Sequence, residues 1–231
     1  MIGIYNLSKK YNDNTVLKID SIEINKGESV GLVGNNGAGK TTLFSLLLDL
    51  IQASTGEIKI NGVQVNQSED WKAITGAFLD ESFLIDYLSA EEYFYFVGSL
   101  CNWSKEKVDD FIVQYADFFN GEILGKKKYI RDLSKGNQKK VGIIGALIGN
   151  PELVILDEPF ANLDPSSQFR LKSLIRELMN SREVTILISS HDLSHTVEIS
   201  DRIIALDKGG VIKDIATSSD TLSELTEFFS V

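Results

Sequence analysis

The sequence predicts an α/β fold whose core is a mainly parallel sheet. Short apolar runs alternate with longer segments of helical periodicity along most of the 231 residues, and this alternation is typical of a parallel sheet that is covered by helices on both faces. Two segments depart from this pattern. Residues 1–27 alternate apolar and polar side chains, as short antiparallel strands do. Residues 83–133 have helical periodicity, which predicts a helical insert.

Composition narrows the class of protein. A chain of 231 residues with 43% hydrophobic residues suits one large domain with an ample core. The net charge of −10 argues against a nucleic-acid partner, because phosphate contacts need clustered Lys and Arg. The single cysteine, Cys101, excludes an internal disulfide and fits a reducing compartment. No signal peptide and no membrane-spanning run is visible, so we expect a cytoplasmic protein that reaches membranes through a partner.

Five further strands are predicted along the chain, separated by helices or turns. These strands are residues 29–33, 57–62, 73–79, 152–158 and 184–188. Two further apolar runs, residues 202–206 and 211–215, flank Gly209 and Gly210. They predict a hairpin that closes the domain.

The predicted helices begin where polar residues can cap them. Residues 43–48 form the first turns of a helix that ends near Gly56, a residue suited to a helix C-cap. In the insert, Ser89 precedes a helix with acidic residues in its first turn, and Ser104 precedes a second helix. Residues 165–180 place their apolar side chains on one face, as a helix that packs on a sheet does.

The loop after the first core strand has the pattern of a phosphate-binding loop. Residues 34–42 are Gly-Asn-Asn-Gly-Ala-Gly-Lys-Thr-Thr, and they lie between a strand and a helix, as the pattern requires. Glycines let backbone N–H groups approach phosphate oxygens, and the helix N-terminus adds further donors. Lys40 supplies a positive charge for the β- and γ-phosphates, and Thr41 offers a hydroxyl to Mg²⁺. The loop predicts a P-loop NTPase.

Two carboxylates at the end of a later strand supply the rest of this chemistry. A phosphate loop needs a carboxylate near Mg²⁺ and a group that orients or deprotonates the attacking water. Asp157 and Glu158 end an apolar run, and we assign Asp157 to the metal and Glu158 to the water. His191 follows the next apolar run. All these groups are therefore predicted to lie beyond the carboxyl ends of parallel strands, where α/β sheets bind ligands.

Two further stretches become informative through their order along the chain. Residues 133–137 are Leu-Ser-Lys-Gly-Asn and start a helix with a polar turn, and Asp164 follows the two carboxylates in Asn-Leu-Asp-Pro. Together with the phosphate loop, these stretches closely resemble the nucleotide-binding subunit of ABC transporters. The resemblance covers nearly the whole chain, from Tyr11 to the hairpin near Gly210.

The resemblance implies one ATPase domain with an inserted subdomain. Residues 1–82 and 146–231 would form the core with its N-terminal antiparallel β-subdomain, and residues 83–145 the helical subdomain. It also implies pairing with a second copy or with a paralogous ATPase subunit, head to tail, around two ATP molecules with Mg²⁺. Hydrolysis would then drive transport by a membrane permease, with this subunit peripheral on the inner face of the membrane.

The resemblance also assigns roles to individual positions. The catalytic group would comprise Lys40, Glu158 as the general base and His191 as the switch residue at the γ-phosphate. Thr41, Asp80 and Asp157 would serve the metal. The residues that would contact the nucleotide, with Tyr11 stacked on adenine, are Tyr11, Val16, Asn35, Asn36, Gly37, Ala38, Gly39, Lys40, Thr41, Thr42, Ser134, Gly136, Asn137 and Asp164.

Three positions depart from the family pattern. Lys135 replaces the first Gly of the signature usually written Leu-Ser-Gly-Gly-Gln, and Asn137 replaces its Gln. The Ser-Lys-Gly variant looks like that of subunits serving ABC-2 type exporters, so export is the expected direction. Asp80 stands where the family has a Gln between the core and the helical insert. The adjacent Glu81 is the alternative occupant of that position.

Other classes of ABC ATPase are the alternatives to a transport subunit. DNA-repair and chromosome-structure relatives carry long coiled coils, and translation factors usually carry two ATPase domains; this sequence predicts neither. A signalling or cell-division subunit, whose membrane partner moves nothing, stays open. The surface expected to contact a permease consists of Phe83, Leu84, Tyr87 and Leu88.

Overall fold

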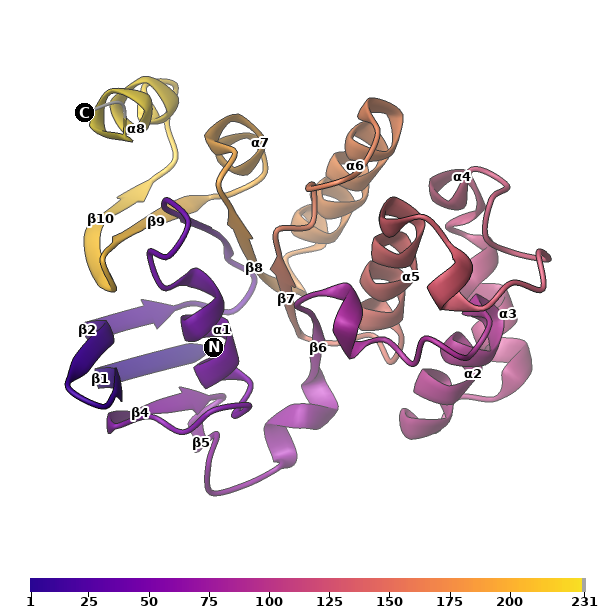
Figure 1. Ribbon diagram of the computed structural model, residues 1–231, viewed down its shortest axis with the longest axis horizontal. Coiled ribbons are helices and arrows are strands. Elements are labelled where there is room, and N and C mark those ends of the chain that lie inside the picture. The colour runs from indigo at the N-terminus through magenta and orange to yellow at the C-terminus, as the bar shows by residue number, and fades with distance from the viewer. Residues whose placement is uncertain (230–231) are drawn as a thin grey trace.

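The computed structural model describes residues 1–229 and contains two sheets with helices around them (Figure 1). The larger sheet has the strand order β10-β9-β3-β8-β7-β6. Its strands are β3 (Ser29–Val33), β6 (Thr75–Phe78), β7 (Leu153–Asp157), β8 (Thr185–Ser190), β9 (Arg202–Asp207) and β10 (Gly210–Ala216). All neighbouring strands pair in parallel except β10, which pairs antiparallel with β9. The predicted α/β class with a mainly parallel sheet is confirmed.

The smaller sheet is antiparallel and begins near the N-terminus. It has the order β2-β1-β4-β5, with β1 (Ile2–Tyr11), β2 (Asn14–Ile24), β4 (Thr55–Ile60) and β5 (Val63–Gln64). Side chains such as Ile4 and Ile22 are buried, because one face of this sheet packs against the helix α1 (Lys40–Leu47). The predicted antiparallel strands of the N-terminal segment are confirmed.

The parallel sheet is buried on both faces, which explains the unbroken apolar runs of its strands. On β7, Val154 and Leu156 pack in a cluster with the helices of the insert. Leu153 and Ile155 point the other way and pack with α1 and the smaller sheet. The strand thereby links the two halves of the hydrophobic core.

Helices cover both faces of the larger sheet, and the insert lies on one side of it (Figure 1). The insert contains α2 (Ala90–Leu100), α3 (Lys105–Val113) and α4 (Ala116–Phe119), and α5 (Lys135–Leu147) leads back to the sheet. The later helices are α6 (Pro165–Ser181), α7 (Leu193–Glu198) and α8 (Thr221–Phe229). Short 3₁₀ turns are η1 (Asp70–Ile74), η2 (Glu81–Phe83) and η3 (Ile130–Asp132). Ser89 and Ser104 cap α2 and α3, as predicted.

The helix that follows the phosphate loop is shorter than predicted. It ends at Leu47 rather than near Gly56, which lies within β4. The chain leaves the helix where Asp49 adopts a left-handed conformation with φ of +51°. The apolar pattern continues beyond this point because Leu48 and Ile51 pack on the same core without being helical. Periodicity alone therefore overestimated the length of this helix.

The carboxyl ends of β3, β7 and β8 lie side by side in the sheet. The register places Ser189 of β8 opposite both Asp157 of β7 and Leu32 of β3. The phosphate loop after β3, Glu158 after β7 and His191 after β8 therefore emerge at one edge, as expected for a ligand site in a parallel sheet. No helix within residues 1–229 is long and apolar enough to cross a membrane.

Candidate active site

The phosphate loop joins β3 to α1 with a backbone suited to anion binding. Gly39 is the N-cap of α1 and has φ of +106°, a conformation that other residues rarely adopt. The first N–H groups of α1 have no acceptor within the helix, so they are available to an anion. Asn35, Asn36 and Gly37 are exposed at the tip of the loop, whereas Ala38 is buried. The loop therefore presents mainly backbone groups to a ligand.

The ammonium group of Lys40 is held inside the loop. Lys40 is 7% exposed, and its Nζ donates to the carbonyl oxygen of Gly34 at 2.7 Å. The same Nζ lies 3.5 Å from Oε1 of Glu158. Because a buried cation is costly without polar partners, these oxygens stabilise a charge in the position where the loop would receive phosphates.

Asp157 is buried at the end of β7 and accepts two hydroxyl donors. Thr41 donates from Oγ1 to Oδ2 at 2.7 Å, and Ser189 donates to Oδ1. Burial raises the pKa of Asp157, and the hydrogen bonds from Ser189 and Thr41 oppose that rise. A carboxylate beside the hydroxyl of a phosphate loop is a set of oxygen donors that suits a hard cation such as Mg²⁺.

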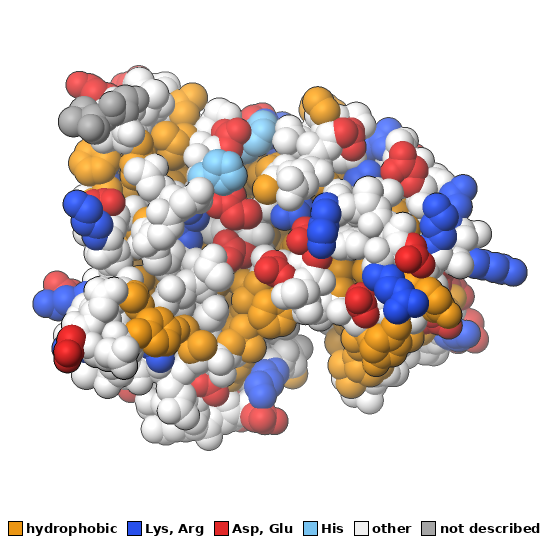
Figure 2. Space-filling model, viewed as in Figure 1, with side chains coloured by type: hydrophobic (Ala, Val, Ile, Leu, Met, Phe, Trp, Pro, Cys, Tyr) orange, Lys and Arg blue, Asp and Glu red, His pale blue; other side chains and the backbone are white. Residues whose placement is uncertain are grey.

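Glu158 directs its carboxylate toward His191 from a left-handed backbone. Its φ is +47°, and its N–H donates to the carbonyl oxygen of Ser189 at 3.2 Å and to Oγ of Ser189 at 3.0 Å. Oε2 of Glu158 lies 2.8 Å from Nδ1 of His191. Strained conformations of this kind concentrate at functional sites. Figure 2 shows acidic side chains next to a histidine near the upper centre of the viewed face.

Tyr11, the predicted adenine platform, ends β1 and is 52% exposed. Nζ of Lys9 lies 4.8 Å from the centre of the Tyr11 ring and also donates to the carbonyl oxygen of Gln52 at 2.7 Å. The ammonium covers one face of the ring, so a base would stack on the other face. Val16 lies beside the phosphate loop, because a Cβ at Gly39 would stand 3.4 Å from its carbonyl oxygen.

The predicted signature residues lie at the start of α5. Ser134 is the N-cap and accepts a hydrogen bond from the N–H of Asn137 at 3.2 Å. The side-chain amide of Asn137 donates to Oε2 of Glu122 at 2.9 Å, so it is engaged within its own chain. Gly136 packs closely against the loop that follows the carboxylates: a Cβ at Gly136 would stand 2.8 Å from the carbonyl oxygen of Asn162.

Asp164 is the N-cap of α6. Its Oδ1 accepts from Oγ of Ser166 at 2.6 Å and from the N–H of Ser167 at 3.0 Å. These donors hold the pKa of the Asp164 carboxyl well below its usual range. Within residues 1–229, no hydrogen bond links Asp164 or the signature residues to the phosphate loop of the same chain. The structure therefore does not join these predicted site residues to the phosphate loop through hydrogen bonds.

Asp80 and Glu81 point to different surroundings. Asp80 is exposed and caps η2, accepting the N–H of Ser82 at 2.5 Å, and hydrogen bonding from Ser82 lowers its pKa. The side chain of Glu81 is 17% exposed, and its Oε1 lies 3.7 Å from Nζ of Lys139. Asp80 is the carboxylate that stays open to solvent.

Two polar residues that sequence reasoning missed complete the site. Ser189 bonds both Asp157 and Glu158, and Lys139 donates from Nζ to the carbonyl oxygen of Glu158 at 2.8 Å. Ser189 could have been found, because it is a small polar residue at the end of a strand in the predicted sheet. Lys139 gives no such signal, since its place depends on how α5 packs against β7.

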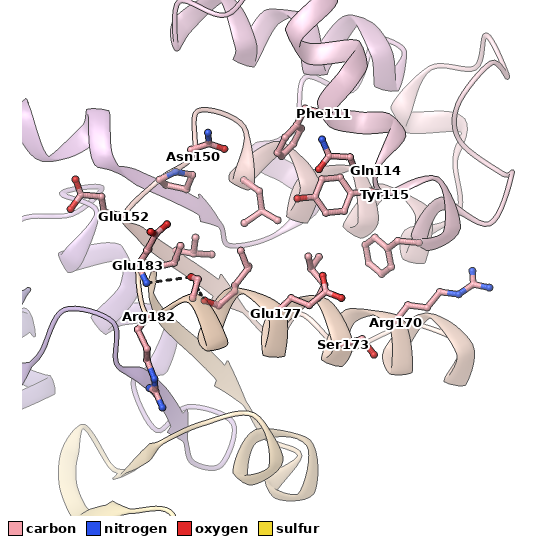
Figure 3. Close-up of a pocket in the computed structure, with 18 of the residues that line it drawn as sticks. Phe111, Gln114, Tyr115, Asn150, Glu152, Arg170, Ser173, Glu177, Arg182 and Glu183 are labelled. Carbon is pink, nitrogen blue, oxygen red and sulfur yellow. Dashed lines mark hydrogen bonds between the residues drawn. The ribbon is translucent and has the colours of Figure 1, made fainter.

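A large groove lies away from this cluster, between α3 and α6 (Figure 3). Its volume is about 990 Å³. Figure 3 shows Phe111, Gln114 and Tyr115 on one wall and Glu177 on the other. None of the predicted site residues lines it. The chemistry that the sequence predicts therefore gathers at the edge of the sheet rather than in this groove.

Known proteins with similar sequences are ABC ATP-binding proteins. A family model described as ABC transporter matches residues 17–161. The chain is 37% identical over 222 residues to an uncharacterised ABC transporter ATP-binding protein of Methanocaldococcus jannaschii, covering 93% of this chain and 79% of that one. It is 32% identical over 243 residues to the phosphonates import ATP-binding protein PhnC of Wolinella succinogenes, covering 99% and 88%.

Solved structures share the same fold. A structure described as the ATP binding subunit of an ABC transporter has a TM-score of 0.83 at 26% identity, covering 100% of this chain and 95% of that one. A dimeric ATP-binding cassette in a post-hydrolysis state with ADP and Pi has a TM-score of 0.81 at 24% identity, covering 95% and 100%. The chain belongs to the ABC transporter family, as an ATP-binding domain that hydrolyses ATP.

Proposed function

We propose that this subunit hydrolyses ATP in a pair of head-to-tail ATPase subunits and thereby drives a membrane permease. One observation carries the catalytic part: Asp157, Glu158 and His191 converge with the phosphate loop at one edge of the sheet. A buried carboxylate, a water-accessible carboxylate and a lysine are the groups that phosphoryl transfer to water needs.

Each of these groups has a proposed role. Lys40 leaves Glu158 and neutralises the β- and γ-phosphates, and Glu158 takes the proton of the attacking water. His191 holds the Glu158 carboxylate and contacts the γ-phosphate. Thr41 and Asp157 would hold Mg²⁺, whose charge stabilises the phosphates when it is bound.

The metal would need further ligands from the nucleotide and from water. Within residues 1–229, no group of three or more His, Cys, Asp or Glu side chains is arranged to hold a metal alone. Phosphate oxygens and water would therefore complete the coordination, as Mg²⁺ commonly requires. We propose that Asp80 acts through one of these waters, because its carboxylate is open to solvent while Glu81 faces Lys139.

The nucleotide site is proposed to be shared between two subunits. One subunit supplies Tyr11, Val16 and residues 34–42, and the other supplies Ser134, Gly136, Asn137 and Asp164. Two features support this division. Ser134, Gly136, Asn137 and Asp164 make no hydrogen bond to the phosphate loop of their own chain within residues 1–229. In addition, a cassette of the same fold is described as a dimer. The partner is a second copy or a paralogous subunit.

The permease is proposed to contact the surface that follows Asp80. Phe83 and Tyr87 are 60% and 64% exposed, and Leu88 is half-buried. Leu84 is 7% exposed and packs in the core, so it was wrongly included in the predicted surface. We also propose the division into a core and a helical subdomain, residues 83–145, which is supported by α2–α5 packing in one cluster on a single face of the sheet.

We propose export as the direction of transport, on the ground of Lys135. Family membership does not choose a direction, because relatives include proteins named for phosphonates import and for spermidine/putrescine import. A subunit of a signalling complex on the membrane is the alternative function. The native complex can be purified, its membrane protein identified, and transport measured in vesicles. These experiments distinguish export, import and a complex that transports nothing.

The ATPase mechanism is tested by Glu158→Gln. The variant should bind ATP but hydrolyse it slower by about 10²-fold or more, and it should accumulate as an ATP-bound pair. Size-exclusion chromatography with ATP and with ADP measures the pairing, and Lys40→Ala should show neither pairing nor turnover. Normal hydrolysis by Glu158→Gln would remove Glu158 from the role of base.

A further inference from the structure

Lys139 is a buried lysine to which the reaction above gives no role. It lies on α5 and is 5% exposed. Its Nζ donates to the carbonyl oxygen of Glu158 at 2.8 Å, lies 3.7 Å from Oε1 of Glu81, and lies 5.8 Å from the centre of the Phe78 ring. One ammonium group thereby joins α5, the turn η2 and the end of β7.

The backbone of Glu158 needs such a partner because its conformation is strained. A left-handed residue that is not glycine persists only where its surroundings determine it. Ser189 holds the N–H of Glu158, and the carbonyl oxygen accepts from the N–H of Ala161 at 3.2 Å as well as from Lys139. The bond from Lys139 is the charge-assisted one and is therefore the stronger of the two. It restrains the peptide group that joins Glu158 to Pro159, next to the residue whose carboxylate contacts His191.

Glu81 is the counter-charge that keeps Lys139 in place. Oε1 of Glu81 is buried and, within residues 1–229, accepts no hydrogen bond; the ammonium group of Lys139, 3.7 Å away, is its ion-pair partner. Burial lowers the pKa of Lys139, and the charges of Glu81, Glu158 and Asp157 oppose that fall. An apolar side chain would fill such a position without the cost of burying two ions. The presence of both charges here, despite that cost, points to a role beyond packing.

We propose that Lys139 is a positioning residue for ATP hydrolysis, which fixes the peptide of Glu158 and is itself held by Glu81. The proposal rests on the proposed role of Glu158 as the base. Lys139 acts through Glu158 and needs no contact with the nucleotide. Its loss should therefore slow the chemical step while ATP binding is preserved.

Three variants of the whole chain test this role. Lys139→Met removes the charge and keeps the length of the side chain. The double variant Lys139→Met with Glu81→Gln also removes the carboxylate that the first change leaves without a partner. Lys172→Met is the matched control, because Lys172 is 15% exposed on its side chain and pairs with Glu198 on the outer helices. For each variant kcat, the Kd for ATP and the Tm are measured.

Lys139→Met should lower kcat about tenfold or more, leave the Kd for ATP within about threefold, and lower Tm. The double variant should recover Tm, because no buried charge is left alone, while its kcat stays low. Lys172→Met should keep the parental kcat. If the double variant recovers kcat together with Tm, the role of Lys139 is structural and the proposal fails.

If Lys139→Met alone does not fold, the double variant still tests whether Lys139 positions Glu158. Glu158→Gln, measured beside it, separates two kinds of failure. Parental hydrolysis by Glu158→Gln overturns the proposed base. An inactive Glu158→Gln together with a fully active double variant overturns the role of Lys139 and leaves the proposed function intact.

Discussion

Nδ1 of His191 lies 2.8 Å from Oε2 of Glu158, and the backbone N–H of His191 donates to the same oxygen at 3.3 Å. The two residues follow neighbouring parallel strands, β7 and β8, so the sheet sets their separation. One carboxylate oxygen is thus held by two donors of the same residue, provided that Nδ1 carries the proton. The other oxygen faces Lys40.

His191→Ala should slow ATP hydrolysis by about 10²-fold, because the Glu158 carboxylate loses its side-chain partner. ATP affinity should fall much less, since the phosphate loop stays intact. Steady-state hydrolysis and ATP titrations measure the two effects. His195→Phe is the control, because His195 packs its ring against Phe160 with centres 5.1 Å apart. Equal losses in the two variants would contradict a specific role for His191.

Asp157→Asn should abolish hydrolysis and stabilise the nucleotide-free protein. Burial raises the pKa of Asp157 in the folded state, so its ionised form costs stability at neutral pH. We therefore expect a higher Tm for the variant than for the parent at neutral pH. The difference from the parent should shrink as the pH falls through the folded-state pKa, because the parent carboxyl then becomes neutral. A lower Tm for Asp157→Asn at neutral pH would contradict this account.

Asp164→Ala and Asp164→Asn should separate capping from pairing. Ala removes the N-cap of α6 and should cost about 1 kcal/mol, whereas Asn caps as well as Asp does. The pKa of Asp164 is depressed in the folded state, so its stabilisation is present above the ordinary pKa and is lost as the pH falls. Thermal unfolding from acid to neutral pH measures this. If Asp164 contacts the partner subunit, both variants should weaken the ATP-dependent pairing of Glu158→Gln, while Ala should lower Tm more than Asn does.

Tyr11→Ala should weaken ATP binding about tenfold, because stacking of a base on an aromatic ring contributes about 1–3 kcal/mol. Tyr11→Phe keeps the ring and should bind ATP about as tightly as the parent does. GTP binding should fall by a similar factor in Tyr11→Ala, because stacking does not select the base by hydrogen bonds. Competition titrations with both nucleotides measure this, and an unchanged affinity of Tyr11→Ala would remove Tyr11 from the site.

Charged residues at Phe83 and Tyr87 should separate the subunit from its permease. Both side chains are more than half exposed, so Glu at these positions should leave folding and the basal ATPase rate of the isolated subunit unchanged. Co-purification with the permease should be lost, because a carboxylate does not fit an apolar contact. Val113→Glu is the control, because Val113 is an exposed apolar residue elsewhere, on α3. Retained co-purification would place the contact elsewhere.

Much of the site could be predicted because its residues follow the ends of strands. Asp157 ends a strand, while the phosphate loop, Glu158 and His191 each follow one, and a parallel sheet gathers such ends at one edge. Side-chain partners were harder to predict. Ser189 meets Asp157 through the strand register, and a one-residue slip would turn it to the other face.

Features that depend on tertiary packing could not be predicted from local patterns. Lys139 occupies a helix whose residues are buried all round from Asn137 to Leu147, so no polar stripe marks it. Leu84 looks like its exposed neighbour Phe83 in the sequence, yet it is buried. The end of α1 depends on a single left-handed residue, Asp49, within an apolar run. In each case the deciding contact comes from residues distant in the chain or from one backbone torsion.

The close approach of Gly136 to Asn162 would link the two nucleotide sites of the proposed pair. In the proposed pair, Gly136 contacts the nucleotide of the neighbouring subunit, while Asn162 lies in the segment that follows Glu158, which acts on the nucleotide of its own subunit. With room for no Cβ between them, a shift of one segment displaces the other. A change at one nucleotide site of the proposed pair would thus be transmitted to the other, so that hydrolysis at the two sites would be coupled.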